Sequence, residues 1–222
     1  MKCFVIAMDK EAAPVIAAMK VESDSKKCGK RVICGGLFGE KVGVVVCGVG
    51  KVNAACGAQM AIDLLGADTV INLGVAGGLN GSVEIGKVYA VSAAVQYDFD
   101  LTQLNGTKIG TLDECKDNYL PLSLSDAYPP RKVGTGDRFN DDKADYELLT
   151  SYLGADIREM ECAAIAQVCM HAEVPFFAFK AISDLAGKGS TTEQFLNNLD
   201  LCFKNIALEL ETIVKSAARE NL

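Results

Sequence analysis

The sequence predicts an α/β fold, because a strand–helix–strand unit is visible in its C-terminal half. Residues 157–160 read as an extended run, residues 161–172 as a helix of mostly small and apolar residues, and residues 179–184 as a short apolar strand that ends in Ser-Asp. Acidic residues stand at the ends of both strands, which is where open α/β sheets place their binding sites. The length of 222 residues, 50% of them hydrophobic, suits a single domain over residues 1–222 with a substantial core.

The N-terminal residues predict a strand followed by a helix. Residues 2–7 are apolar enough for a buried strand, and residues 11–20 have the pattern of a helix. Pro14 is tolerated only in the first turn of a helix, so we expect this helix to begin near residue 10 or 11. Glu11 then follows a strand end closely, and two interpretations stay open: a functional carboxylate, or a first-turn acid favoured by the helix dipole.

The rest of the chain predicts further elements with turn residues between them, and an irregular segment that we interpret as a lid or an interface. In order, these are a hairpin of strands 30–36 and 41–47, a helix over 51–65 that stops at Gly66, a strand over 69–73, a strand over 83–95, the irregular segment 103–130, a strand end and turn at 133–140, and a last helix that follows a capping box at 190–193. No internal repeat or linker interrupts this order.

Two glycine-rich runs stand where backbone could approach a ligand. The run Cys47–Lys51 is not a Walker phosphate loop, because that loop needs Gly and Ser or Thr where this chain has Val45 and Val52. The run Gly74–Gly81 follows a β-branched strand and lets backbone approach a ligand or a neighbouring strand. It lacks the G-x-G-x-x-G fingerprint, so we expect no dinucleotide or flavin cofactor.

The composition excludes several functional classes. A net charge of −7 without a basic cluster argues against nucleic acid and against an anionic membrane surface as partners. The N-terminus is too short for a signal h-region, and no apolar run approaches the roughly 20 residues of a membrane span. We therefore expect a cytoplasmic protein.

Cysteine and histidine usage points to carboxylate chemistry. The nine cysteines are scattered without a C-x-x-C pair, which suits free thiols and argues against a zinc site. The one histidine, His171, stands at a helix end, where a charged or hydrogen-bonding end residue is the simpler interpretation. Without a second histidine, most Ser-His-Asp and Cys-His schemes are excluded. Carboxylates must then carry any chemistry.

Six motifs together resemble the nucleoside phosphorylase/nucleosidase superfamily, and most closely its methylthioadenosine/S-adenosylhomocysteine nucleosidases. The resemblance covers nearly the whole chain and rests on Ala7–Glu11 (Ala-Met-Asp-Lys-Glu), Gly48–Ala55, Ile71–Leu79 (Ile-Asn-Leu-Gly-Val-Ala-Gly-Gly-Leu), Gly136–Phe139 (Gly-Asp-Arg-Phe), Glu159–Glu161 (Glu-Met-Glu) and Ala181–Asp184 (Ala-Ile-Ser-Asp). It implies a three-layer αβα sandwich with a mixed central sheet. It also implies hydrolysis of a purine nucleoside in methionine salvage, without metal or cofactor, by a homodimer whose neighbour closes the 5′ side of the pocket.

The resemblance assigns the two catalytic groups. Cleavage of an N-glycosidic bond passes through an oxocarbenium-like state, with an activated water on one face and a protonated leaving group on the other. In the family, the acid after the first strand activates the water, and here that residue is Glu11. The Asp of the Ser-Asp strand end protonates the purine at N7, which points to Asp184, with Ser183 helping to hold it.

The same resemblance implies the substrate contacts. Glu161 would bind the ribose hydroxyls with Met160 against the sugar, Phe139 would stack on the base, and backbone groups at 139–140 would read the base edge. The substrate-binding set is then Met8, Val75, Phe139, Asn140, Glu159, Met160, Glu161 and Ser183.

Four positions depart from the nucleosidase pattern and leave the substrate open. Val75 replaces a usual Ser, Asn140 stands where Ile or Val is common, Tyr97 replaces a His before Asp98, and Lys180 stands where Arg is common. The change at Asn140 leaves open whether the base is a 6-amino or a 6-oxo purine. The size of the accepted 5′ substituent is open as well.

Two rival functions are considered beside hydrolysis. A phosphorylase of the same superfamily would need positive charge for phosphate, whereas a carboxylate at position 11 repels it. None of the five arginines stands in the family's phosphate positions; they are Arg31, Arg131, Arg138, Arg158 and Arg219. A non-catalytic nucleoside-binding protein would need the ribose contact but no water-activating acid opposite a proton donor. The presence of Glu11, Glu161 and Asp184 together favours the hydrolase.

Overall fold

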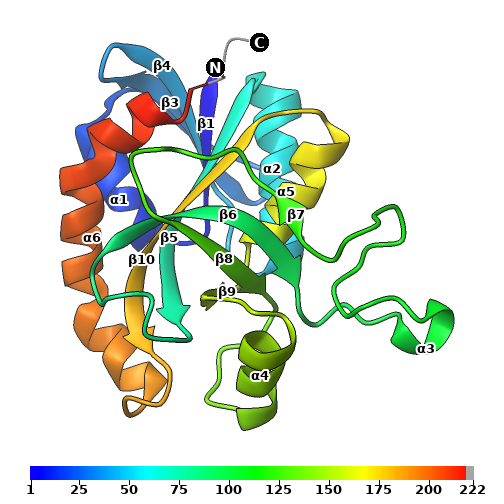
Figure 1. Ribbon diagram of the computed structural model, residues 1–222. Helices are drawn as coiled ribbons and strands as arrows, with labels where there is room; N and C mark the ends of the chain where they lie inside the picture. Colours follow the sequence, from blue (N-terminus) through cyan, green and yellow to red (C-terminus); the bar gives the residue numbers. More distant parts are fainter. Residues whose placement is uncertain (219–222) are drawn as a thin grey trace.

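A ten-stranded sheet forms the centre of the protein in a computed structural model that describes residues 1–218 (Figure 1). Its strand order is β10-β6-β8-β9-β5-β1-β4-β3-β2, with β7 added at β6. The strands are β1 Lys2–Ile6, β2 Lys20–Lys27, β3 Lys30–Leu37, β4 Glu40–Val46, β5 Thr69–Gly78, β6 Val88–Gln96, β7 Leu120–Pro121, β8 Pro130–Thr135, β9 Ile157–Glu159 and β10 Phe176–Leu185. Both parallel and antiparallel pairs occur along this order, so the predicted mixed sheet is confirmed.

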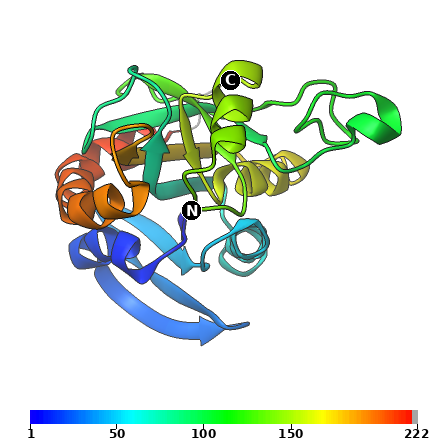
Figure 2. The same cartoon turned by 90° about the horizontal axis from the view of Figure 1, so that it is seen from below.

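Helices cover both faces of the sheet and complete the predicted three layers (Figures 1 and 2). The helical elements are α1 Asp9–Ala18, α2 Lys51–Leu65, α3 Thr102–Asn105, α4 Lys143–Glu147, the π-helical turn η1 Leu148–Tyr152, α5 Cys162–His171 and α6 Thr191–Ser216. Seen along the sheet, α1 and α6 lie on one side and α2 and α5 on the other (Figure 2). Strand β1 is buried between them, because Phe4 and Ile6 face the α1–α6 core while Cys3 and Val5 face the α2–α5 core.

Part of the sheet closes on itself beside the helices. Strand β10 pairs with both β6 and β5, and the order β6-β8-β9-β5 links those two strands along the other side. In this ring β9 runs antiparallel to β5, so the short strand β9 lies beside the last residues of β5, which also pair with the carboxyl end of β10. Residues at those strand ends can therefore face one shared cavity.

The first helix begins earlier than predicted. Helix α1 starts at Asp9 rather than at residue 10 or 11, so Pro14 lies beyond the first turn. The expectation that Pro14 marks the first turn was therefore wrong. A proline here removes one intrahelical hydrogen bond, to the carbonyl of Lys10, and the exposed position of Lys10 lets water replace it.

Other boundaries confirm most of the predicted elements. The hairpin, the helix that stops at Gly66, helix α5 and the long last helix capped by Ser190 all occur. Strand β5 continues through the glycine run to Gly78. The strand predicted over 83–95 occurs as β6 but begins only at Val88, so its predicted start was wrong. The segment predicted as irregular contains part of α3, the short β7 and the first residue of β8. Its α3 end extends away from the sheet in Figure 1, whereas β7 pairs with β6.

Candidate active site

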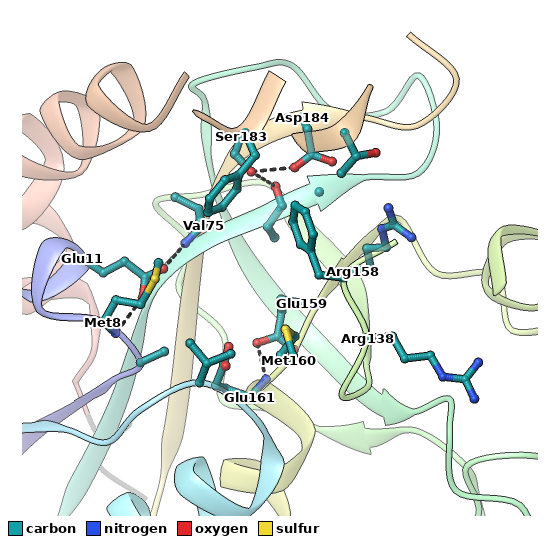
Figure 3. A pocket seen from close by; sticks show the side chains of 17 residues that line it. Met8, Glu11, Val75, Arg138, Arg158, Glu159, Met160, Glu161, Ser183 and Asp184 are labelled. Carbon is teal, nitrogen blue, oxygen red and sulfur yellow. Dashed lines mark hydrogen bonds between the residues drawn. The ribbon is translucent and has the colours of Figure 1, made fainter. Parts of the chain in front are cut away.

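A cavity of about 390 Å³ opens where the closed ring of strands ends. It is lined by nine of the ten residues that the sequence singled out: Met8, Glu11, Val75, Phe139, Glu159, Met160, Glu161, Ser183 and Asp184. Figure 3 shows Glu11 and Asp184 at separate ends of this cavity. Glu161 lies below both of them in this view, at the start of α5. We call the part around Glu11, Glu159 and Glu161 the sugar end and the part around Ser183 and Asp184 the base end, after the roles expected from the sequence.

The carboxylate of Glu11, in the first turn of α1, accepts hydrogen bonds from two backbone amides. Its Oε1 accepts a hydrogen bond from the Val75 amide at 2.9 Å, and its Oε2 accepts one from the Met8 amide at 3.2 Å. Glycine at position 74 makes room for it, because a Cβ there would lie 2.5 Å from Oε1. The side chain is buried, and this burial raises its pKa, while the charge of Lys180 and the two amides lower it.

Glu159 holds the N-terminus of α5. Its carboxylate accepts hydrogen bonds from the amides of Glu161 at 3.0 Å and Cys162 at 2.9 Å. The Thr135 hydroxyl donates to Oε1 at 2.5 Å, and the Lys180 ammonium donates to Oε2 at 2.9 Å. Both partners of the Lys180–Glu159 ion pair are almost fully buried. Since its oxygens are occupied by protein donors, a substrate contact of Glu159 stays a prediction.

Glu161 points into the cavity from the start of α5. Its Oε1 accepts a hydrogen bond from the Gly50 amide at 2.8 Å, and Gly50 adopts a positive φ of 97° at the N-cap of α2. Burial and the neighbouring charge of Glu159 raise the pKa of Glu161 to about 7. The glycine run at 48–50 thus binds a carboxylate of the protein itself.

The ammonium group of Lys180 interacts electrostatically with these acids. Burial by itself would lower the pKa of Lys180, but the charges of Glu159 and Glu161 outweigh burial and raise the pKa above its ordinary value. The lysine therefore stays protonated and offsets part of the acidic charge at the sugar end. Within residues 1–218, no group of three or more His, Cys, Asp or Glu side chains is placed to hold a metal ion.

Asp184 lies at the base end, beyond an irregularity in β10. The register of β10 against β5 shifts between Ile182 and Asp184. The Ser183 hydroxyl donates to Asp184 Oδ2 at 2.7 Å, and glycine at position 77 leaves space for the carboxyl, since a Cβ there would lie 2.7 Å from Oδ1. Burial raises the pKa of Asp184, while the Ser183 hydrogen bond and the charge of Arg158 oppose the rise. Such a carboxyl retains its proton to higher pH than an exposed one.

Two aromatic rings form a wall of the cavity. Phe139 is 51% exposed, and its ring packs edge-on against Phe195 at a centroid distance of 5.3 Å. The sequence placed Phe195 in the core stripe of the last helix; it also lines the cavity and was missed as a site residue. Its position at the start of α6, one turn after the Ser190 cap, is the signal that could have found it.

Two arginines also line the cavity and were not predicted to do so. Arg138 pairs with Asp145 at 2.7 Å and is largely exposed, whereas Arg158 lies beside Asp184 in Figure 3. Asn140, expected at the base edge, is not among the lining residues, because its side chain donates to Asp145 at 2.8 Å and accepts from Arg158. Its contact with a base stays a prediction, and Arg219 lies outside the described residues.

Comparison with known proteins agrees with this geometry. Residues 2–215 match the family model described as the phosphorylase superfamily. The chain belongs to this superfamily. Among its members, the 5′-methylthioadenosine/S-adenosylhomocysteine nucleosidase of Geobacillus thermodenitrificans is 31% identical over 237 positions, covering 99% of this chain and 100% of the relative. The resemblance drawn from the six motifs is thereby confirmed.

Solved structures of superfamily members have the same fold. The 5′-methylthioadenosine/S-adenosylhomocysteine nucleosidase of Colwellia psychrerythraea, solved in complex with adenine, is 27% identical with a TM-score of 0.88 and covers 98% of this chain and 96% of that chain. Futalosine hydrolase of Helicobacter pylori also superposes with a TM-score of 0.88 at 23% identity, over 96% of this chain and 97% of that chain, which shows the likeness in fold.

Proposed function

We propose that the protein hydrolyses the N-glycosidic bond of 5′-methylthioadenosine and S-adenosylhomocysteine, releasing adenine and the thioribose derivative. One observation carries this proposal: two buried carboxyls with raised pKa values, Glu11 and Asp184, lie at separate ends of one cavity. A glycosidic hydrolase needs a base for water and an acid for the leaving group on opposite sides of the bond. The named nucleosidase relatives support this reaction.

The proposed mechanism assigns each end of the cavity a task. Glu11, whose raised pKa makes it a stronger base, takes a proton from water that attacks C1′ of the ribose. Glu161 accepts hydrogen bonds from the ribose hydroxyls, and Met160 packs against the sugar. The anionic charge of these carboxylates stabilises the oxocarbenium-like transition state. Water is bound and activated without any metal or cofactor in this proposal.

At the base end, the leaving group is protonated as the bond breaks. Burial raises the pKa of Asp184, which favours its protonated form, and in this proposal Asp184 delivers a proton to N7 of the purine while Ser183 fixes its orientation. Phe139 and Phe195 offer ring surfaces for stacking on the base. The released base then leaves as a neutral molecule.

Water is favoured over phosphate as the nucleophile. The sugar end holds three carboxylates and Lys180, whose ammonium is already bound to Glu159. A phosphate would meet net negative charge there, and the cavity arginine nearest the acids lies at the base end beside Asp184. Binding without catalysis is a weaker alternative, because it requires neither Glu11 nor a protonated Asp184.

The test is cleavage of 5′-methylthioadenosine followed by chromatography, with and without added phosphate. Adenine and methylthioribose in phosphate-free buffer would support hydrolysis. Cleavage that requires phosphate and yields the sugar phosphate would make the protein a phosphorylase, and no cleavage under either condition would contradict the proposal. The Glu11→Gln variant, prepared in parallel, shows whether any adenine released comes from this cavity.

We also propose that the protein acts as a cytoplasmic homodimer in methionine salvage, with residues 1–222 forming a single domain. No helix within residues 1–218 is long and apolar enough to cross a membrane. Light scattering of the purified protein would measure the mass of the particle in solution.

A further inference from the structure

The guanidinium of Arg158 is a donor group at the base end of the cavity. Arg158 lies in β9, lines the cavity, and stands beside Asp184 in Figure 3. One terminal nitrogen donates to the backbone oxygen of Asn140 at 2.5 Å, and the other donates to Asn140 Oδ1 at 3.3 Å. A guanidinium carries five N–H groups and no acceptor, so it keeps further donors for a ligand.

Asn140 does not line the cavity and presents no acceptor there to an amino group of the base. Both of its oxygens already accept hydrogen bonds from Arg158, and its amide nitrogen donates to Asp145 at 2.8 Å. Arg138 holds the other oxygen of Asp145 at 2.7 Å, which fixes this arrangement from the outer side. An exocyclic amino group at C6 would therefore meet donors, whereas a carbonyl oxygen at C6 would accept from them.

The charge of Arg158 also favours a 6-oxo purine over adenine as the base. Cleavage breaks the C1′–N9 bond, and its electron pair goes to the base; the water oxygen bonds to C1′, Glu11 takes the water proton and Asp184 gives its proton to N7. In a 6-oxo purine, the electron pair delocalises onto O6, where a guanidinium stabilises it. Adenine also leaves as a neutral base, but its C6 amino group is a donor and offers the guanidinium no acceptor. The charge of Arg158 also works against the raised pKa of Asp184.

We infer that Arg158 extends the base specificity of this site to 6-oxo purines, so that the protein hydrolyses 5′-methylthioinosine with a kcat/KM within tenfold of, or above, that for 5′-methylthioadenosine. The inference rests on the proposed function, because it uses the same cavity and the same two acids. Arg158 is here a specificity-determining residue, and Asn140 is a positioning residue that orients its guanidinium.

The experiment measures kcat/KM for both nucleosides with the wild-type protein, Arg158→Leu and Arg158→Lys. Removing a charged donor to O6 should lower kcat/KM for 5′-methylthioinosine by about 10- to 100-fold in Arg158→Leu, while kcat/KM for 5′-methylthioadenosine stays level or rises. Arg158→Lys keeps the positive charge but loses the planar guanidinium. Its kcat/KM for 5′-methylthioinosine should lie between those of the wild-type protein and Arg158→Leu. Lys215→Gln, which removes an exposed positive charge on α6, is the matched control and should leave the ratio of the two substrates unchanged.

A second measurement needs no variant. Hypoxanthine and adenine are compared as inhibitors of the wild-type protein, and hypoxanthine should bind within tenfold of adenine or more tightly. A role of Arg158 in holding the loop alone would lower activity on both nucleosides equally and leave their ratio unchanged in Arg158→Leu, which would overturn the inference. Cleavage of 5′-methylthioadenosine but not of 5′-methylthioinosine would overturn it while leaving the proposed function intact. Cleavage of neither would overturn both.

Discussion

The two ends of the cavity are built in different ways. At the sugar end, carboxylates are fixed by backbone amides: Glu11 by Met8 and Val75, and Glu161 by Gly50. At the base end, side chains hold one another on the loop that follows β8, and Arg138 and Phe139 there are more than half exposed. Main-chain donors cannot change with a single substitution, whereas a side-chain network can.

This difference separates the three acids of the sugar end from the loop at 138–140. Substitutions at the sugar end are expected to change rate and stability together, because the same carboxylates hold α1, α2 and α5 in place. Substitutions on the loop at 138–140 are expected to change which base is accepted, because its backbone and side chains are not shared with the core. The three acids of the nucleosidase pattern are present, whereas departures occur at both ends: Val75 and Lys180 at the sugar end, and Asn140 on the loop.

Glu11→Gln gives the largest expected effect. The substitution keeps the shape of the side chain but removes the base, so turnover of 5′-methylthioadenosine should fall by about 10⁴-fold. Adenine binding, measured by calorimetry, should change by only a few-fold, because the base end is untouched. Turnover close to that of the wild type would mean that the sugar end does not activate water.

Asp184→Asn should have the next largest effect. The amide cannot supply the proton to N7, so kcat should fall by about 10³-fold in a steady-state assay. Ser183→Ala is a milder substitution for comparison. It removes only the hydrogen bond to Asp184 and should reduce kcat far less than Asp184→Asn does. An Asp184→Asn enzyme within a few-fold of the wild type would show that another group protonates the base.

Lys180→Met tests how strongly the sugar end depends on its buried ion pair. Removal of the ammonium leaves Glu159 buried without its partner, and the free energy of unfolding should fall by about 3–5 kcal/mol. The exposed pair of Lys215 and Glu211 serves as the control, since Lys215→Gln should cost at most about 0.5 kcal/mol. Urea unfolding curves measure both, and equal effects would contradict a special role for the buried pair.

The pH dependence of stability should be set in part by Glu161. Its pKa rises from the ordinary value of 4.5 to about 7 on folding, so the folded state binds its proton more tightly than the unfolded state does. Its contribution to stability is then full below pH 4.5 and is lost as the pH rises through about 7, a change of about 3 kcal/mol. Urea unfolding of the wild type and Glu161→Gln at pH 5 and pH 8 gives this difference. A constant difference between the two proteins would contradict the raised pKa.

The sequence predicted the sugar end well because its residues carry local signals. Glu11, Glu159 and Glu161 each stand where a strand meets a helix, and glycines at positions 50 and 74 mark where backbone or side chains come close. Such signals depend on neighbours in the chain. They are therefore visible without a structure, although the roles of these acids in catalysis stay predictions.

At the base end, Phe139, Ser183 and Asp184 were expected from the sequence, but its other contacts could not be predicted, because they join distant segments. Arg158 reaches Asn140 across the sheet, Asn140 turns to Asp145 rather than into the cavity, and Phe195 comes from the last helix. Strand β2 was missed for another reason: Lys20–Lys27 is exposed along its whole length and has no apolar pattern, as is common for a protected edge strand. Closure of the sheet through β10 is likewise a pairing between distant segments.

The glycines of β5 have a stereochemical consequence. Gly74 makes room for Glu11 and Gly77 makes room for Asp184, and a strand rises about 3.3 Å per residue, so these two spaces lie on the order of 10 Å apart. Glu11 is proposed to activate water and Asp184 to protonate N7, so water itself, rather than a carboxylate, forms the new bond to C1′ in one displacement. In the proposed hydrolysis, water therefore attacks from the side opposite the base. The β-nucleoside gives the α-anomer of the thioribose product first, before the anomers equilibrate in solution.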